Sequence, residues 1–388
     1  MIGFDEALAL VAGVAKPLGA ETVPLGEAHG RILAAPVIAQ VDAPPRDVSA
    51  MDGYAVRVAE LPGRLPVAGV AYPGDPTPVL GPGTCIRIFT GSPIPDGADR
   101  VVIQENVTRE DDEALFGAAD GGRHIRRRGA DFERGAVLLE AGRRLDPRAL
   151  LAAAGADLGA VEVWRRPRLA LLGTGDELAE PGTARSIPGA IPESVSIGVG
   201  ALAREHGAEV VMIRRLKDEL PMLEQAAADA LAAADLVVVT GGASVGEKDY
   251  AKAMFAPAGL ELLFAKVAIK PGKPVWLGRA GGRLVMGLPG NPTSAMVTAR
   301  LLLAPLVAGL AGRDSILNWR EAALAAPLDP NGGRESFVRA VWAGAAVRPA
   351  DDQDSGAQKT LADAELLIRR RAGAPAAEAG ETVEIIDL

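Results

Sequence analysis

The sequence predicts a multidomain α/β plus β protein in which a doubly wound α/β unit lies between two β-rich regions. Its 388 residues correspond to about two to three domains. Between residues 168 and 311, strand-like apolar runs alternate with alanine-rich helical stretches, a pattern typical of a largely parallel sheet covered by helices. On either side of this unit, short apolar runs are separated by proline and glycine, which favours strands joined by turns.

The N-terminal part begins with a helix and continues as extended chain. Apolar residues repeat at helical spacing over residues 4–15, and Asp5 and Glu6 stand where a secretory signal would carry Lys or Arg. Residues 20–50 contain several prolines, which favour extended backbone. Residues 54–145 are punctuated by proline and glycine, and we expect them to form a β-rich region.

A second helix follows, and then the alternating unit begins. Asp146 and Pro147 form a good helix start, because the first can cap the helix and the second fits its first turn. In the central unit, strands are expected at 168–172, 209–213 and 236–239, and helices at 196–206, 220–234 and 292–311. A boundary is expected at 312–315, after which residues 320–388 return to short β-like runs.

Composition excludes several classes of function. The net charge of −9 and the small number of aromatic residues disfavour a nucleic-acid binder. Cys85 is the only cysteine, so an intramolecular disulfide or a thiolate metal cluster cannot form, and the three histidines lack the spacing of a zinc site. No apolar run approaches the roughly twenty residues that cross a membrane. We therefore expect a cytoplasmic protein with neither nucleic acid nor membrane as a partner.

Three glycine-rich loops indicate a phosphate-bearing ligand. They cover residues 240–250, 268–274 and 287–293; the first follows a predicted strand, and the third follows the apolar run at 283–286 and opens a helical stretch. Such loops place backbone N–H groups and a helix N-terminus at the carboxyl edge of a sheet, where anions bind. The candidate ligand-binding residues in these loops are Gly241, Gly242, Ser244, Gly246, Lys270, Lys273, Pro289, Gly290 and Asn291. Any one of these loops alone could be a simple turn.

Carboxylates follow the predicted parallel strands. Gly175 and Glu177 come after the first strand, Asp218 after the second and Asp249 after the third, so all fall at one edge of the sheet. Mg²⁺ prefers hard oxygen ligands and bridges to phosphate, which makes the three carboxylates candidate metal ligands and catalytic residues. The lysines of the second glycine loop would offset the phosphate charge. Alternatively, Asp176 and Asp218 only cap helices.

Three polar segments stand out in the N-terminal third, at residues 47–56, 89–93 and 123–131. The last contains an arginine run that would ordinarily be a solvated face. Because a guanidinium group binds oxyanions through two parallel N–H groups, Arg126 and Arg128 are also candidate phosphate contacts.

Taken together, these segments resemble the MoeA family, the molybdopterin molybdenumtransferases, whose animal relative is the E domain of gephyrin. The resemblance extends over nearly the whole chain and depends on several separated motifs. They lie at residues 49–55, 90–91, 95–99, 125–129, 175–178, 241–246, 270–274 and 288–292, and residues 333–339 also match the start of the family's C-terminal domain.

The resemblance implies a four-part protomer. It assigns residues 1–165 to an N-terminal and linker region with an inserted β-rich part at about 54–145. Residues 166–312 would form a molybdopterin-binding α/β domain, and residues 318–388 a C-terminal β-barrel. It also implies an elongated homodimer in which the N-terminal region of one protomer completes the site on the α/β domain of the other.

The family reaction implies a role for each candidate residue. Adenylylated molybdopterin and molybdate would be the substrates, Mg²⁺ the cofactor, and AMP a product. The loops and lysines would hold the pyrophosphate, the carboxylates Mg²⁺, and Asp52 and Thr90 the reacting end across the dimer. Molybdopterin adenylyltransferase and maturation factors of molybdoenzymes would be possible partners.

The sequence departs from the family pattern in two places. Where the family reads Asp, then Ser or Thr, then Asn, this chain has residues 193–195 as Glu-Ser-Val, so an amide is missing and Ser194 is the nearest substitute. The family's Gln-Gly-Ser-His becomes Gln-Asp-Ser-Gly at 353–356, which keeps Ser355 as a candidate contact. These changes leave open a non-catalytic molybdopterin scaffold or carrier.

Two further alternatives remain. Nothing in the residues distinguishes molybdate from tungstate, because the two oxyanions are alike in size and charge. An adenylyltransferase of the preceding step would use a similar α/β domain, but it would need neither residues 1–165 nor the C-terminal barrel.

Overall fold

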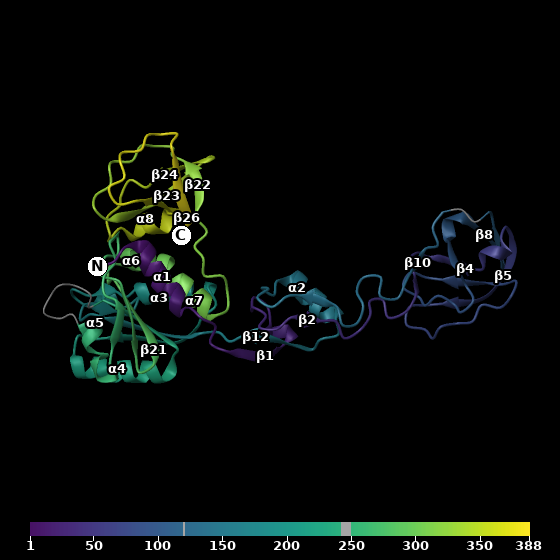
Figure 1. Cartoon of the computed structure of the whole chain (residues 1–388), viewed down its shortest axis with the longest axis horizontal. Helices are drawn as coiled ribbons and strands as arrows, with labels where there is room; N and C mark the ends of the chain where they lie inside the picture. Colours follow the sequence, from purple (N-terminus) through teal and green to yellow (C-terminus); the bar gives the residue numbers. More distant parts are fainter. Residues whose placement is uncertain (119–120, 242–249) are drawn as a thin grey trace. The chain divides into compact units, whose positions relative to one another are not determined.

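The computed structural model describes residues 1–118, 121–241 and 250–388, and the chain forms two compact units. The larger unit contains Met1–Glu21 and Trp164–Leu388, and the smaller contains Thr22–Val163. Figure 1 labels the helices and strands of both.

A six-stranded sheet forms the centre of the larger unit. Its order is β16 (Glu209–Leu216), β13 (Arg168–Thr174), β17 (Leu236–Thr240), β21 (Arg283–Leu288), β20 (Trp276–Ala280) and β18 (Glu261–Phe264). The first four strands are parallel, whereas β20 runs antiparallel to β21 and β18 antiparallel to β20. This sheet confirms the predicted doubly wound α/β fold, and the parallel strands end at one edge, where ligands bind in such folds.

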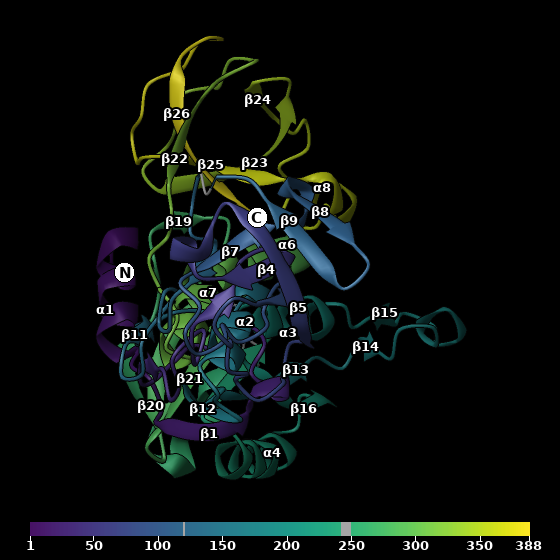
Figure 2. The ribbon, with the colours of Figure 1, turned by 90° about the vertical axis from the view of Figure 1, so that its right-hand side faces the viewer.

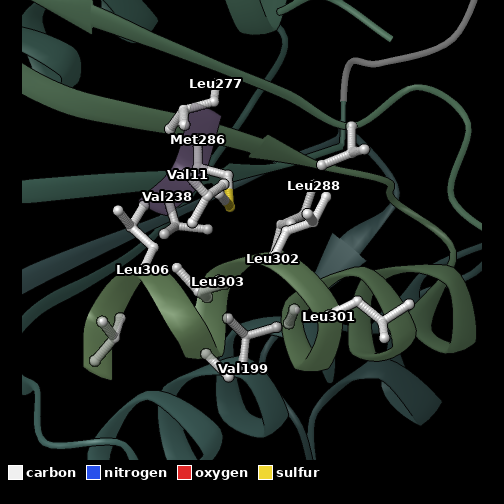
Figure 3. Close-up of a cluster of buried hydrophobic side chains, with 14 of the residues drawn as sticks. Val11, Val199, Val238, Leu277, Met286, Leu288, Leu301, Leu302, Leu303 and Leu306 are labelled. Atoms are coloured by element: carbon white, nitrogen blue, oxygen red, sulfur yellow. The ribbon is translucent and has the colours of Figure 1, made fainter. Parts of the chain in front are cut away.

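Helices cover both faces of the sheet. On one face lie α1 (Phe4–Val14), α3 (Val195–Glu205), α6 (Pro292–Thr298) and α7 (Ala304–Leu310), and on the other α4 (Leu220–Ala233) and α5 (Tyr250–Ala253). Alternate residues of β17 belong to the two cores: Leu236 and Val238 pack on the first face, and Val237 and Val239 on the second. Figure 3 shows part of the first core, with side chains of the sheet beside leucines of the long helix. The continuous apolar run of β17 is therefore explained by burial on both faces.

The long helix over residues 292–310 changes geometry in the middle. A π-helical segment, Ala299–Leu303, separates α6 from α7. Pro305 has no backbone N–H for the usual bond to the carbonyl four residues earlier, and local widening of the helix accommodates this loss. Within the described ranges, this is the helix whose length and hydropathy would suffice to cross a membrane, but 89% of its most apolar window is buried in the protein. It is the core helix of the larger unit.

The first helix belongs structurally to the larger unit. Phe4, Ala7 and Val11 of α1 are buried in the core that the sheet shares with α7. Phe4 also meets Phe337 of the C-terminal region, with ring centroids 4.7 Å apart. The predicted division, which assigns this helix to the N-terminal region, stays a prediction; in the structure the apolar stripe of the helix packs on the α/β part.

The C-terminal region confirms the expected β-barrel. Its strands are β22 (Arg320–Ala323), β26 (Thr382–Asp387), β25 (Leu366–Arg370), β23 (Glu335–Ala343) and β24 (Ala346–Pro349), paired in that order. Figure 2 shows these strands from a second direction. The sheet closes where the backbone N–H of Ala325 donates to the carbonyl of Val347 at 2.8 Å. A short strand β19 (Ile269–Lys270) pairs in parallel with the start of β23, and helix α8 (Gln358–Asp363) follows β24.

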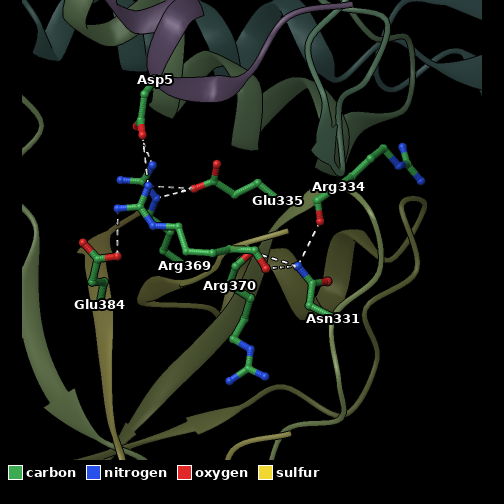
Figure 4. Close-up of polar contacts among 8 residues, drawn as sticks. Asp5, Asn331, Arg334, Glu335, Arg369, Arg370 and Glu384 are labelled. Carbon is green, nitrogen blue, oxygen red and sulfur yellow. Dashed lines mark hydrogen bonds and ion pairs between the residues drawn. The ribbon is translucent and has the colours of Figure 1, made fainter. Parts of the chain in front are cut away.

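A polar network joins α1 to the barrel (Figure 4). The guanidinium group of Arg369 is paired with Asp5 and with Glu335. Arg371 donates to Asp5 at 3.0 Å and to Glu384 at 3.2 Å. These contacts fix the start of the chain against strands β23, β25 and β26.

The smaller unit contains the expected β-rich region and a helical part. A six-stranded sheet has the order β7 (Arg100–Ile103), β4 (Gly53–Val56), β6 (Cys85–Ile88), β5 (Gly63–Ala71), β9 (Glu113–Phe116) and β8 (Val107–Glu110). Helix α2 (Pro147–Gly155) is capped by Asp146, whose Oδ1 accepts from the N–H of Ala149 at 2.8 Å, as predicted. Short strand pairs complete the unit: β1 (Ala20–Pro24) with β12 (Ala160–Trp164), β2 (Val37–Ile38) with β11 (Val137–Leu139), and β3 (Val48–Ser49) with β10 (Ile125–Arg126).

Candidate functional site

A cavity of about 740 Å³ opens at the carboxyl edge of the central sheet. This volume is within the range of about 300–1,000 Å³ that is common for small-molecule sites. Its wall comes from the segments that follow β13, β16, β17 and β21, from the start of α3 and from the barrel. Residues that line it include Thr174, Gly175, Glu177, Glu193, Ser194, Asp218, Gly241, Pro289, Gly290, Asn291, Ser294, Gly356 and Gln358.

Two loops of this wall contact each other at glycine residues, where no side chain separates their backbones. Gly241 has φ of 90°, and a Cβ atom there would lie 2.3 Å from the carbonyl oxygen of Thr174. A Cβ atom on Gly290 would lie 3.3 Å from the Cα atom of Gly241. Only glycine fits at position 241, and the end of β17 thereby lies against the ends of β13 and β21. The prediction that these glycines share one site is consistent with this packing.

Two of the three predicted carboxylates line the cavity together. Glu177 and Asp218 lie in its wall, and Oδ1 of Asp176 accepts from the backbone N–H of Asp218 at 3.1 Å, which joins the two loops. Glu219 occupies the N-cap position of α4 and its side chain makes no capping hydrogen bond, so Asp218 is not the N-cap residue of this helix. Asp249, Gly242, Ser244 and Gly246 lie outside the described residues.

The carboxylates have the chemistry that Mg²⁺ requires. Across the described ranges, no group of three His, Cys, Asp or Glu side chains is placed to hold a metal ion. Magnesium is commonly held by one or two carboxylates, with waters and substrate phosphate oxygens as its remaining ligands. Glu177 and Asp218, which line one cavity beside bare backbone, therefore fit a magnesium ion that arrives with a phosphorylated ligand.

The unusual Glu-Ser-Val segment forms another part of the wall. Glu193 is only 7% exposed, and its Oε1 accepts from the backbone N–H of Ser196 at 2.8 Å, so it caps the first turn of α3. Val195 is 8% exposed and belongs to the apolar core while also lining the cavity. Ser194 lines the cavity too, and its side chain makes no capping bond. The carboxylate of Glu193 therefore stabilises the start of α3, whereas Ser194 supplies a polar side chain to the cavity.

The second glycine loop contributes less to the wall than predicted. Lys270 and Lys273 are exposed and do not line the cavity, although the neighbouring Pro274 does. Both lysines lie in the segment that connects the sheet to the barrel through β19. A role for them in holding phosphate stays a prediction.

The barrel supplies a wall segment that sequence reasoning found only in part. The amide Nδ2 of Asn291 donates to Oγ of Ser355 at 2.9 Å, which brings two predicted residues together. Arg339, which is 1% exposed, holds this segment through the carbonyls of Asp354 at 2.9 Å and Ala357 at 3.3 Å. The available signal for Arg339 was a charged residue among the apolar residues of a strand.

In the smaller unit, the structure brings Asp52 and Thr90 into contact. Both the backbone N–H and the hydroxyl of Thr90 donate to Oδ1 of Asp52, at 2.8 and 2.9 Å. These hydrogen bonds, together with the charge of Arg87, hold the pKa of Asp52 below its ordinary value. Asp52 is half-buried and stays ionised at neutral pH, so it is a fixed anion beside an exposed threonine.

Most of the arginine run forms ion pairs that connect it to another loop. Arg127 pairs with Asp47, and Nε of Arg128 donates to Asp42 at 2.5 Å. Hydrogen bonds from backbone N–H groups and these arginine side chains lower the pKa of both carboxyls. Arg126 is exposed, and its side chain forms no hydrogen bond or ion pair within the part of the chain that the structure describes. Of the two candidate phosphate contacts, Arg126 and Arg128, only Arg126 has a side chain that remains available to a ligand.

Comparison with known families and proteins gives a consistent result along the chain. Residues 2–156 match the model described as the MoeA N-terminal region, residues 170–309 a probable molybdopterin binding domain, and residues 321–388 the MoeA C-terminal region.

Individual proteins match over most of their length. The molybdopterin molybdenumtransferase of Synechococcus elongatus is 34% identical, with 98% of this chain and 97% of the relative covered. That of Haemophilus influenzae is 38% identical over 79% of this chain and 76% of its own. A crystal structure of a molybdopterin biosynthesis MoeA protein from Pyrococcus horikoshii matches 100% of this chain and 99% of its own, with a TM-score of 0.87 and 29% identity.

Proposed function

Since the chain belongs to the MoeA family of molybdopterin molybdenumtransferases, we propose that it inserts molybdate into adenylylated molybdopterin with Mg²⁺-dependent release of AMP. Its general place, as a transferase of molybdenum cofactor biosynthesis, follows from the family. The adenylylated substrate would come from a molybdopterin adenylyltransferase, and the product would pass to molybdoenzyme maturation factors.

The observation that carries the proposal is the cavity at the carboxyl edge of the sheet. It combines bare backbone at Gly241 and Gly290 with the carboxylates of Glu177 and Asp218. Backbone N–H groups at such an edge bind phosphate oxygens, and the carboxylates bind the accompanying cation. Asn291 and Ser355, already hydrogen-bonded to each other, close the barrel side of this region.

Glu177 and Asp218 would hold Mg²⁺, with Asp249 as the third predicted carboxylate. The ion would neutralise charge on the phosphate oxygens and polarise the bond to the leaving adenylate. The protein's own part is to fix the pyrophosphate against the Gly241 and Gly290 loops and to keep the leaving group aligned. The exposed Lys270 and Lys273 would add positive charge beside this position.

We further propose that the active protein is a homodimer with shared sites. Asp52 and Thr90 form a fixed polar pair on the smaller unit, and neither residue lines the cavity at the central sheet. In the proposed dimer, this pair from one protomer faces the cavity of the other and positions molybdate or the dithiolene end of the pterin.

The proposed reaction is tested by omitting one component at a time. Purified protein is incubated with adenylylated molybdopterin, molybdate and Mg²⁺, and AMP is quantified by chromatography. We expect AMP to form with all components present and to fall to background when Mg²⁺ is chelated. Binding of the pterin without AMP release would contradict the proposal.

The shared site is tested by complementation between inactive variants. Asp52→Ala and Asp218→Asn each remove one half of the proposed site, so a mixed dimer retains one intact site. Recovered AMP release after subunit exchange, confirmed with differently labelled chains, supports the arrangement. A monomer in light scattering, or no recovery after confirmed exchange, would refute it.

One observation favours a second candidate, a molybdopterin scaffold or carrier. Val195 presents an apolar side chain to the cavity where the family has an amide. A carrier would bind molybdopterin with and without its adenylate and would release no AMP. The same incubation therefore separates the two functions, and a parallel series with tungstate tests which oxyanion is used.

A further inference from the structure

A second cavity, of about 380 Å³, lies elsewhere in the larger unit and shares no lining residue with the first. It is bounded by the C-terminus of α3, the π-helical segment, residues 314–318 and the ends of strands β22 and β26. Its polar groups include Arg300, Arg320, His206, Ser315 and Asn318. No step of the proposed reaction uses this cavity.

Arg300 is the central cation of this cavity. It lies in the π-helical segment and is half-buried. Its Nε donates to the backbone carbonyl of Asp387 at 2.7 Å, whereas its two terminal nitrogens have no hydrogen-bond acceptor among residues 1–118, 121–241 and 250–388. Burial lowers the pKa of Arg300, since removal from water penalises a charge. A guanidinium in this situation is stabilised by an anion that accepts from its free edge.

The neighbouring carboxylates are already engaged. Asp387 uses its side chain to pair with Arg320. Asp314 is exposed, and its Oδ1 accepts from the backbone N–H of Ile316 at 2.9 Å within its own turn. The charge of Asp387 raises the pKa of Arg300 and so offsets part of the effect of burial. Neither carboxylate is hydrogen-bonded to Arg300, so its terminal nitrogens have no hydrogen-bonded counterion.

The contacts of His206 show which charged groups act at this edge of the cavity. Its Nδ1 lies 2.9 Å from the carbonyl of Leu202, so this nitrogen carries the proton and Nε2 remains for another contact. Burial lowers the pKa of His206, and the charges of Arg300 and Arg313 lower it further, against the opposing charge of Glu205. Two arginine charges therefore act on His206 at this edge of the cavity.

The π-helical segment places Arg300 at this cavity. The π turn over Ala299–Leu303 precedes Pro305, and both Arg300 and Pro305 line the cavity. Such turns occur mostly as single insertions in α-helices, frequently at functional sites. Here the turn lies in the otherwise apolar core helix and carries its one charged residue.

We propose that this cavity binds a tetrahedral oxyanion, which accepts from the terminal nitrogens of Arg300 and from donors on Arg320, Ser315 and Asn318. The chemistry of the site fits molybdate, phosphate, sulfate or the phosphate group of a larger molecule. The cavity is larger than one such ion, so water or the rest of a phosphate ester fills the remaining space. This site is independent of the proposed reaction.

The location is tested by soaking crystals of the full chain with tungstate and recording anomalous diffraction. We expect a peak beside Arg300, in addition to any peak in the first cavity. Calorimetric titration with molybdate, phosphate, sulfate and AMP then distinguishes which of these oxyanions the cavity binds. Retention of molybdate in excess phosphate indicates a molybdate site, equal competition a general oxyanion site, and binding of AMP a phosphate-ester site.

Charge-changing variants test the residues. Arg300→Gln should remove the peak and lower the affinity at least tenfold. Asn318→Asp adds a negative charge at an exposed position and should also weaken binding, whereas Asp314→Asn should strengthen it. Arg348→Gln, which removes an exposed arginine of the barrel outside this cavity, is the matched control and should change nothing. If Arg300→Gln proves unstable, the oxyanion affinities of Asn318→Asp and Asp314→Asn still test the proposal.

Absence of a peak beside Arg300 at saturating tungstate would overturn the proposal. Equal affinity for the oxyanion in Asn318→Asp, Asp314→Asn and the wild-type protein would overturn it as well. Neither result would affect AMP release, so this proposal fails or survives separately from the proposed function.

Discussion

Replacing Gly241 with alanine tests the close backbone approach on which the first cavity depends. Two costs arise at this position. A left-handed backbone conformation costs an L-residue roughly 1–2 kcal/mol, and φ of Gly241 is 90°. The new Cβ atom would also lie 2.3 Å from the carbonyl oxygen of Thr174, and overpacking of this kind costs about 1–3 kcal/mol.

Gly259 provides a matched control, because it separates the two costs. Its φ of 68° is also left-handed, but a Cβ atom there would meet no atom within 4 Å. Gly259→Ala should therefore show only the backbone cost. The difference between the two variants, about 1–3 kcal/mol, corresponds to roughly 2–12 °C in the unfolding midpoint of a unit of this size.

The assay is thermal unfolding of both variants by calorimetry, followed by measurement of AMP release below the lower midpoint. Gly241→Ala should unfold at a lower temperature than Gly259→Ala and lose most of its activity, because the end of β17 is displaced from Thr174. Equal midpoints and unchanged turnover would refute the close-packed geometry of this wall.

Three further predictions concern other residues. Hydrogen bonds from Thr90 depress the pKa of Asp52, so this carboxylate stabilises the folded protein above about pH 4 and loses that effect as the pH falls further; acid unfolding followed by circular dichroism should be less steep in Asp52→Asn than in the wild type. Arg339→Met should remove one donor from each of the carbonyls of Asp354 and Ala357, at about 1.5–3 kcal/mol each because the donor is charged, and should raise the KM for the pterin about tenfold, whereas Arg348→Gln should not. Val195→Asn should tighten binding of adenylylated molybdopterin about tenfold or more in calorimetry, at some cost in stability because Val195 is buried; unchanged or weaker affinity would show that the pocket no longer uses this position.

Local signals were sufficient for the regular elements. The apolar run of β17 and the Asp146 cap predicted their elements correctly because each depends on neighbouring residues. The prediction that Glu177 and Asp218 lie at one edge of the sheet also agrees with the structure, where both residues line one cavity. Its basis was the rule that parallel strands end at the same edge of a sheet. The shared role of Asp52 and Thr90, by contrast, was implied only by the family resemblance, and their direct contact was not predicted, since 38 residues separate them.

Long-range contacts account for what the sequence did not predict. The partners of the arginine run lie 80 and 86 residues away, so an exposed face and a set of ion pairs look the same in sequence. The first helix joined the larger unit because its stripe of Phe4, Ala7 and Val11 fits the core beside α7, which no neighbouring residue reveals. The buried Arg339 is recognisable only once the segment that it holds is folded against Asn291.

The most direct test of the proposed function is a single-turnover measurement of AMP release in Asp218→Asn. The change keeps the shape of the side chain and removes a carboxylate from the cavity wall. Glu180→Gln is the control, because Glu180 is an exposed carboxylate in the segment that follows β13 and does not line the cavity. The proposal predicts that Asp218→Asn releases AMP at least about a hundredfold more slowly than wild type, or ~2.7 kcal/mol in barrier, while Glu180→Gln keeps the wild-type rate. Equal rates in all three proteins would show that the chemistry takes place elsewhere.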